Sequence, residues 1–184
     1  MSMPADDEGT GTEVGLSAAD HSQGDPQARV TLLEYGDYEC AACIQAAPLV
    51  RHLVDSNNGR LRFVFRHFPL VEVHPNAELA AEAAEAAAAQ GKFWPMHDVL
   101  FAQPHHLTAA ALDGYAQQIG LDMVRFKAEM ADRIYTQRVQ EHRRAGVQSG
   151  LRATPMFFLN DRVVDVSFGL EKLDEAVHAA LNAQ

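Results

Sequence analysis

The two cysteines of the chain, Cys40 and Cys43, stand where a strand pattern gives way to a helix pattern. The apolar run of residues 30–35 precedes them, and apolar residues recur every three to four positions after them. A cysteine at the start of a helix lies beside N–H groups that have no partner within the helix, and these favour its thiolate. The pattern predicts thiol–disulfide chemistry, with Cys40 as the attacking sulfur and Cys43, one turn later, as the resolving one.

Two other interpretations of the pair have less support. Inert cysteines are common in protein cores, but core packing gives no reason for the Cys-x-x-Cys spacing. A zinc site would need two further ligands, and the adjacent His105 and His106 lack the separation of three to five residues that is usual for zinc-binding histidines. The sequence therefore predicts neither a metal nor an organic cofactor.

Composition limits the partners and the location. A chain of 184 residues, 47% of them hydrophobic, suits one domain with a full core. The net charge of −10 argues against a nucleic-acid partner, and no run approaches the roughly 18–20 apolar residues of a membrane span. The acidic residues 1–8 lack the basic start and apolar run of a secretory signal. We therefore expect a cytoplasmic location, or a periplasmic one if a signal has been removed.

The order of predicted elements gives the domain organisation. Residues 1–20 are polar and glycine-rich and are expected to form a mobile tail, with residues 21–184 as the folded domain. Strands at about 29–35 and 61–66, with the cysteine-bearing helix between them, predict a βαβ unit. Helices are expected at about 74–90, 93–102, 108–118 and 122–148, the last with a break near Asp132. Strands within 154–159 and 162–166, joined by the turn residues 160–161, predict a β-hairpin, and a helix at about 170–182 follows.

This order, with Thr154-Pro155 ahead of the hairpin, resembles the thioredoxin fold, and the helical insertion at about 67–152 resembles that of the DsbA-type branch. The motifs that carry the resemblance are EYGDYECAAC at 34–43, RHFPL at 66–70, HPNA at 74–77, GKFWPMHD at 91–98 and ATP at 153–155. The resemblance runs from about residue 24 to the C-terminus. It implies a thioredoxin-like α/β fold and an enzyme that is a protein dithiol–disulfide oxidoreductase.

The resemblance also implies a substrate site. Pro155 would be cis and lie beside the cysteine pair, and a cis X–Pro bond is much less costly than other cis bonds. The backbone N–H and C=O of Thr154 would then pair with an extended client segment. The expected partners are a cysteine-containing client protein or peptide and an unidentified redox partner that recycles the pair.

The residues between the cysteines, Ala41 and Ala42, depart from the family pattern, in which strong oxidants usually carry His or another polar residue there. The pKa of Cys40 should therefore be lowered from about 8.5 but not to the extreme of about 3.5. A less stabilised thiolate predicts a reduction potential of about −180 to −270 mV. The histidines in the family-like motifs, His67, His74 and His97, could approach the pair or could bond within the core.

Two rival functions remain open. One is a glutathione-dependent transferase or isomerase on the same fold, although such relatives usually have Ser or a single Cys in place of the pair, so Cys43 argues against it. The other is a redox-responsive binding module, in which the pair is a switch and the helical insertion is the interaction surface.

Overall fold

The structure is a computed structural model that describes residues 15–103 and 105–183. Its centre is a five-stranded sheet with the strand order β1-β3-β2-β4-β5. The strands are β1 (His21–Gly24), β2 (Val30–Gly36), β3 (Leu61–His67), β4 (Met156–Leu159) and β5 (Arg162–Val164). The strands β2 and β3 are parallel, and the other neighbouring pairs are antiparallel. With the helical insertion between β3 and β4, this arrangement confirms the predicted thioredoxin-like α/β fold.

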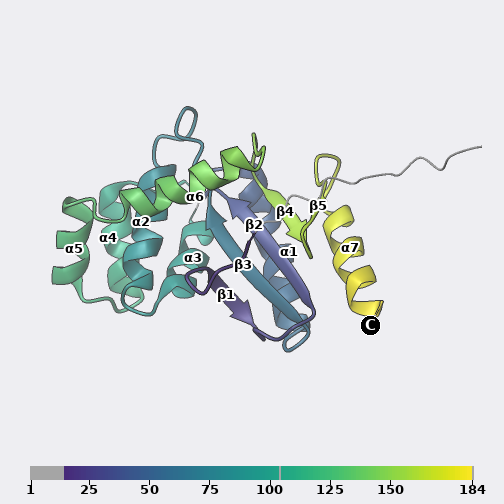
Figure 1. Cartoon of the computed structure of the whole chain (residues 1–184). Coiled ribbons are helices and arrows are strands. Elements are labelled where there is room, and N and C mark those ends of the chain that lie inside the picture. The colour runs from purple at the N-terminus through teal and green to yellow at the C-terminus, as the bar shows by residue number, and fades with distance from the viewer. Residues whose placement is uncertain (1–14, 104, 184) are drawn as a thin grey trace, which may run out of the picture.

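Seven helices surround the sheet in the described part of the chain. They are α1 (Ala41–Ser56), α2 (Ala77–Ala88), α3 (Phe93–Ala102), α4 (Ala109–Gln118), α5 (Met123–Ala131), α6 (Thr136–Gln148) and α7 (Glu171–Asn182). In Figure 1, α2, α4 and α5 form one end of the molecule, α7 forms the other, and α6 runs back over the top towards β4. None of these helices has the length and apolar character that crossing a bilayer requires.

The central strands are buried on both faces because successive side chains point in opposite directions. Leu32 of β2 pairs with Phe63 of β3, and both belong to the larger core, which α1 and α7 also line. The next residues along these strands, Leu33 and Val64, also pair, and they belong to a smaller core on the opposite face. The sheet is therefore held from both sides, which fixes the position of the turn that carries the cysteines.

Helix α2 is the centre of the helical block. Most of its residues are alanines, and its buried positions are Ala77 and residues 80–87. Alanine is the strongest helix former and lets neighbouring helices approach closely. Helices α3, α4, α5 and α6 all contact α2. The block is therefore assembled around one small-residue helix.

Helix α6 approaches the sheet closely at Gly146. A Cβ atom at this position would lie 2.7 Å from the ring of Phe68 and 3.4 Å from that of Tyr35. Any larger residue would force the ring of Phe68 to move, whereas the distance to Tyr35 is an ordinary contact. The glycine therefore allows α6 to lie against the sheet, although glycine weakens a helix interior.

Two elements differ from the sequence prediction. Strand β1 was not predicted, because its sequence, HSQG, is short and polar, yet it pairs antiparallel with the edge of β3. Helix α2 begins at Ala77 instead of about residue 74, because Pro75 disfavours helical geometry at the residue before it. That shift leaves His74 in a turn.

Residues 15–20, the described part of the predicted tail 1–20, are joined to the folded domain. Residues 1–14 lie outside the described residues, but the carboxylate of Asp20 accepts two hydrogen bonds of 2.8 Å from Arg66. The carbonyl of Gly15 accepts another from Arg66 at 2.7 Å. Burial acts against the charge of Asp20, but this pairing outweighs it and lowers the pKa of the carboxyl. The folded domain therefore begins before residue 21.

Candidate active site

The cysteines lie at the beginning of α1, directly after the turn that follows β2. Cys40 is the N-cap residue, with an extended backbone, and Cys43 is in the first turn of the helix. Cys40 is 8% exposed and Cys43 is 0% exposed. The structure thus has Cys40 as the more accessible sulfur, as the sequence predicts.

Hydrogen bonding favours the thiolate of Cys40. The bond from the Cys43 thiol is the main cause that lowers the pKa of Cys40 to about 5, and Thr154 and the backbone N–H groups of Cys43 and Ala42 contribute further. Partial burial acts in the opposite direction. The sequence prediction assigned the leading role to the backbone N–H groups, but the structure assigns it to Cys43. Burial and the bond to Cys40 raise the pKa of Cys43 well above its ordinary value, so Cys40 ionises first.

The Thr154–Pro155 pair lies beside Cys40. The peptide bond between the two residues is cis, as predicted. The Sγ of Cys40 is 3.5 Å from the carbonyl oxygen of Thr154. The hydroxyl oxygen of Thr154 is buried and has no hydrogen-bond partner. The hydroxyl is therefore available as a donor to a negative charge on Cys40.

Glu34 is a buried acid beneath the pair that the sequence analysis did not identify. It is 2% exposed, and its Oε1 atom has no hydrogen-bond partner. Burial, and then the charge of Cys40, raise the pKa of Glu34 to about 8, so the carboxyl is mainly protonated at neutral pH. A cavity of about 300 Å³ between α1 and α3 is lined by Glu34 and reaches the exposed Arg51. The only signal in the sequence is an acid within an otherwise apolar strand.

Asp37 joins the cysteine turn to the loop that follows β3. Its buried carboxylate accepts hydrogen bonds from the N–H of Glu39 at 2.7 Å and from the N–H of Leu70 at 2.9 Å. The same carboxylate pairs with Nδ1 of His74 at 2.7 Å. The backbone carbonyl of Asp37 also accepts the N–H of Cys40 at 3.2 Å. His74 is therefore tied to the turn that carries the attacking sulfur.

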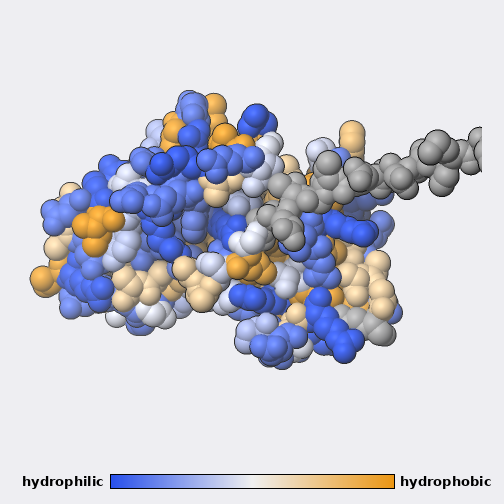
Figure 2. Space-filling view, in the orientation of Figure 1, coloured by the Kyte–Doolittle hydropathy of each residue, from blue (hydrophilic) through white to orange (hydrophobic). Residues whose placement is uncertain are grey.

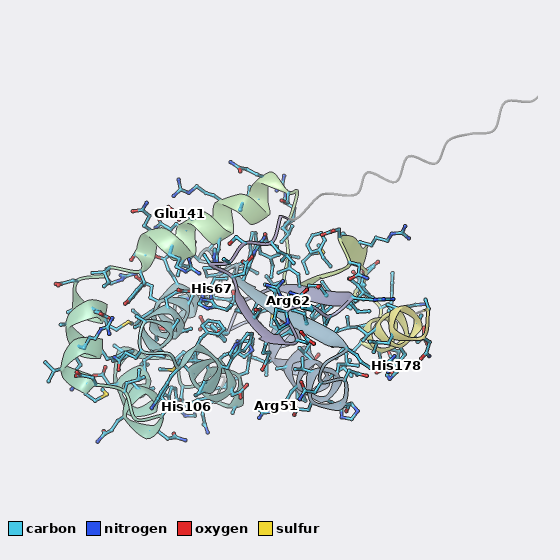
Figure 3. The ribbon with its side chains drawn as sticks, turned by 60° about the horizontal axis from the view of Figure 1, so that its bottom comes forward. Arg51, Arg62, His67, His106, Glu141 and His178 are labelled. Carbon is cyan, nitrogen blue, oxygen red and sulfur yellow. The ribbon has the colours of Figure 1, made fainter. Side chains whose placement is uncertain are left out.

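The other two histidines of the motifs are core residues. His67 lies inside the molecule between the sheet and the helical block, whereas Arg51, His106 and His178 lie at its periphery (Figure 3). Burial lowers the pKa of His97 to about 3, and its Nδ1 atom bonds the buried hydroxyl of Tyr38 at 2.9 Å. Both histidines are thus used in packing.

His67 belongs to a buried network around Glu85. The Oε1 atom of Glu85 is 2.6 Å from Nε2 of His21 and 2.8 Å from Nε2 of His67, and its Oε2 atom accepts a bond from Arg138 at 2.7 Å. His21, His67 and Glu85 are the one group in the described residues whose ligand atoms are close enough together for a metal ion. Because hydrogen bonds occupy both carboxylate oxygens and a cation lies beside them, the arrangement fits an ion-pair network better than a metal centre.

A family model described as thioredoxin matches residues 17–179. The chain is 47% identical over 161 residues to a Na⁺/H⁺ antiporter NhaA 1 of Salinispora arenicola, and 38% identical over 161 residues to a Na⁺/H⁺ antiporter NhaA of Herminiimonas arsenicoxydans. Each match covers 88% of this chain, but only 24% and 25% of the respective relatives. The chain therefore spans about a quarter of the length of these curated relatives.

Solved structures of similar fold cover nearly the whole chain. A thioredoxin-like oxidoreductase from Silicibacter pomeroyi matches with a TM-score of 0.77 and 27% identity, over 91% of this chain and 95% of that one. Oxidised BdbD from Bacillus subtilis matches with a TM-score of 0.78 and 21% identity, over 88% and 92%. The protein α-DsbA1 from Wolbachia pipientis matches with a TM-score of 0.78 and 19% identity, over 95% and 97%.

Proposed function

Because this chain belongs to the thioredoxin family and has the DsbA-type fold, we propose that it is a thiol–disulfide oxidoreductase in which Cys40 and Cys43 exchange disulfides with cysteines of a client protein or peptide. The observation that carries the proposal is the difference between the two sulfurs. Cys40, at the N-terminus of the helix and 8% exposed, has a lowered pKa, and Cys43 is fully buried with a raised one. One sulfur is suited to attack and the other to resolution.

Exchange proceeds in two steps when the pair starts reduced. The Cys40 thiolate attacks one sulfur of a client disulfide, a Cys40–client bond forms, and the other client sulfur leaves as a thiolate. Cys43 then loses its proton and attacks the Cys40 sulfur, which closes the Cys40–Cys43 disulfide and releases the second client thiolate. Two electrons pass from the pair to the client, and the reverse sequence oxidises a client dithiol.

The proton of Cys43 has a nearby acceptor in Glu34. The negative charge of Glu34 is among the causes that raise the pKa of Cys43, after burial and the bond to Cys40, so the two groups are electrostatically coupled. Once Cys40 is in a mixed disulfide, its charge no longer opposes the ionisation of Glu34. The ionised carboxylate can then accept the proton of Cys43 and release it through the cavity between α1 and α3.

The client lies along Thr154 and Pro155 in this proposal. An extended segment that pairs with the backbone of Thr154 brings its sulfur to Cys40, because the two residues are in contact. The loop after β3 adds exposed apolar side chains, Val71 and Val73, on the element that Asp37 ties to the cysteine turn. The face in view in Figure 2 is otherwise mainly hydrophilic with small separate apolar patches. A client with apolar residues beside its cysteine fits this surface.

The cytoplasmic location is part of the same proposal. In the cytoplasm the pair would be kept reduced and the protein would act as a reductase, whereas in the periplasm an oxidised pair would make it an oxidase. Trapping of free thiols in intact cells distinguishes the two. A pair that is mostly oxidised in the cell would contradict the cytoplasmic reductase.

A second function is favoured by the curated relatives. They are named Na⁺/H⁺ antiporters, and the region similar to this chain is about a quarter of each. This supports the redox-responsive module as an alternative, with a membrane transporter as the partner that responds to the state of the Cys40–Cys43 pair. Turnover separates the two functions, because a switch needs one exchange per signal and an enzyme needs many.

The experiment is the reduction of a fluorescent disulfide peptide with glutathione as the electron source. The wild type is expected to complete many turnovers, Cys40→Ala none, and Cys43→Ala to accumulate the mixed disulfide at Cys40. The exposed variant Ser56→Ala, at the far end of α1, serves as the control with unchanged turnover. A wild type that reacts once and stops would favour the module, and strong residual activity in Cys43→Ala would favour a glutathione-dependent transferase.

A further inference from the structure

The loop between β3 and α2 is fastened to the cysteine turn at several points. The carboxylate of Asp37 binds the N–H of Leu70 and the ring of His74, as described above. Beyond these bonds, the carboxylate of Glu39 accepts the N–H of Asn76 at 2.8 Å. Two acids of the turn, Asp37 and Glu39, are therefore each bonded to this loop. These bonds hold Leu70 before His74 and Asn76 after it, and so fix this part of the loop relative to the cysteine turn.

The surroundings of His74 favour its positively charged form. Partial burial of the ring disfavours the charge, but the hydrogen bond and charge of Asp37 and the charges of Cys40 and Glu39 outweigh it and raise the pKa of His74. These are the charged groups that face it. The remaining acid of the loop, Glu72, is paired with Arg143 of α6 at 2.6 Å. The side chain of His74 is 23% exposed, so the core does not enclose it completely.

We propose that His74, oriented by Asp37, is the electrostatic partner of the Cys40 thiolate and raises the reduction potential of the cysteine pair. The inference rests on the proposed function, because it concerns the same sulfur. The residues between the cysteines, Ala41 and Ala42, provide no cation or side-chain donor. His74 lies on a neighbouring loop and is bonded to the carboxylate of Asp37. It can therefore provide the positive charge that Ala41 and Ala42 cannot.

The expected effect follows from the charge of each redox state. The reduced pair carries a thiolate at Cys40, and the disulfide carries no charge, so an imidazolium at His74 stabilises only the reduced form. A more stable reduced form means a higher potential. Asp37 acts through His74 and is a positioning residue, since its carboxylate holds Nδ1 of the imidazole at 2.7 Å.

The experiment compares His74→Gln, which removes the charge, with His74→Lys, which keeps one. The pKa of Cys40 is read from thiolate absorbance during a pH titration, and the potential is read by equilibration with glutathione buffers. His74→Gln is expected to raise the pKa of Cys40 by about one unit, a tenfold effect that lowers the potential by about 30 mV. His74→Lys should recover at least half of that shift. His52→Gln, on the exposed side of α1, should change neither quantity.

A dependence on pH separates charge from structure. The difference in potential between wild type and His74→Gln should shrink as the pH rises and the imidazole loses its proton, at a pH above its ordinary pKa. The proposal is overturned if His74→Gln leaves the pKa and the potential unchanged, or if the difference persists unchanged at high pH. If either result is found while the wild type still turns over the peptide, only the role of His74 is refuted. If the wild type does not turn over the peptide, the proposed disulfide exchange itself is refuted.

Discussion

The Sγ of Cys40 lies 3.5 Å from the carbonyl oxygen of Thr154, although 114 positions separate the two residues in the chain. The contact depends on the pairing of β2 with β4, which places Tyr35 opposite Met156 and so brings the start of the hairpin to the end of the first central strand. The hydroxyl of Thr154 is buried and has no other hydrogen-bond partner, and the Thr154 side chain is among the groups that lower the pKa of Cys40. Removal of this hydroxyl should therefore change the ionisation of Cys40.

Replacement of Thr154 by Val keeps the shape of the side chain and removes the hydroxyl. The thiolate of Cys40 loses a donor, so the pKa of Cys40 should rise by about one unit, the scale of a hydrogen bond to a charged group. The potential should fall by about 30 mV. Thr154→Ser keeps the hydroxyl and is the matched control. Equal pKa values of Cys40 in the Val and Ser variants would show that the hydroxyl does not reach the sulfur.

Cys43 should control the ionisation of Cys40 through its S–H donor. Cys43→Ala removes the donor and should raise the pKa of Cys40, while Cys43→Ser supplies a hydroxyl and should leave it nearer the wild-type value. Thiolate absorbance against pH measures both. In the reduced wild type, Cys40 should also react with iodoacetamide before Cys43. The assignment of roles fails if Cys43 is labelled first.

The buried acid Glu34 should make the oxidised protein less stable as the pH rises. In the reduced protein, burial and then the charge of Cys40 raise the pKa of Glu34 from 4.5 to about 8. In the oxidised protein burial still raises the pKa, so the folded protein holds a proton that the unfolded chain releases. The stability that this group contributes is complete below about pH 4.5 and is lost as the pH rises through the raised pKa. The slope is at most about 1.4 kcal/mol per pH unit.

Urea unfolding of the oxidised protein from pH 5 to 9 tests this expectation, because the disulfide has no thiolate that titrates. Glu34→Gln should remove the downward trend, and the exposed Glu141→Gln should keep it. Parallel curves for the wild type and Glu34→Gln would mean that Glu34 has an ordinary pKa in the folded protein.

Glu85 should be important for stability but not for exchange. Glu85→Gln leaves Arg138 and the ring of His67 without their buried anion, and breaking a buried ion pair costs about 3–5 kcal/mol. The control on the same helix is Glu78→Gln, whose partner Arg133 is half exposed and whose loss should cost less than about 1 kcal/mol. Denaturant unfolding measures both. Similar values for the two variants would contradict the importance of the buried network.

The sequence was sufficient for the elements that depend on local pattern. The strands β2 and β3, the helix after Cys40 and the hairpin follow from periodicity and turn residues, and the reactive cysteine follows from its place at a helix start. The cis bond before Pro155 came from the family resemblance. Each of these features is determined by a short stretch of sequence or is indicated by a recognised motif.

The environment of the site could not be predicted in the same way. Glu34 becomes a buried acid only because β3, β4, α1 and α3 enclose it, and no local pattern describes that enclosure. The three motif histidines look alike in the sequence, yet His67 binds Glu85, His97 binds Tyr38 and His74 binds Asp37. Their partners are fixed by long-range packing. Strand β1 likewise owes its form to the open edge of β3.

The enclosure of α2 by four other helices has a consequence for motion. Its amide hydrogens can meet solvent only when α3–α6 separate from it, because residues 80–87 are buried. Exchange of these amides with deuterium therefore reports the opening of the whole block and not the fraying of a single turn. Helix α2 should contain the slowest-exchanging amides of the block. If oxidation of Cys40 and Cys43 changes how often the block opens, the exchange rate of these amides should differ between the reduced and the oxidised protein.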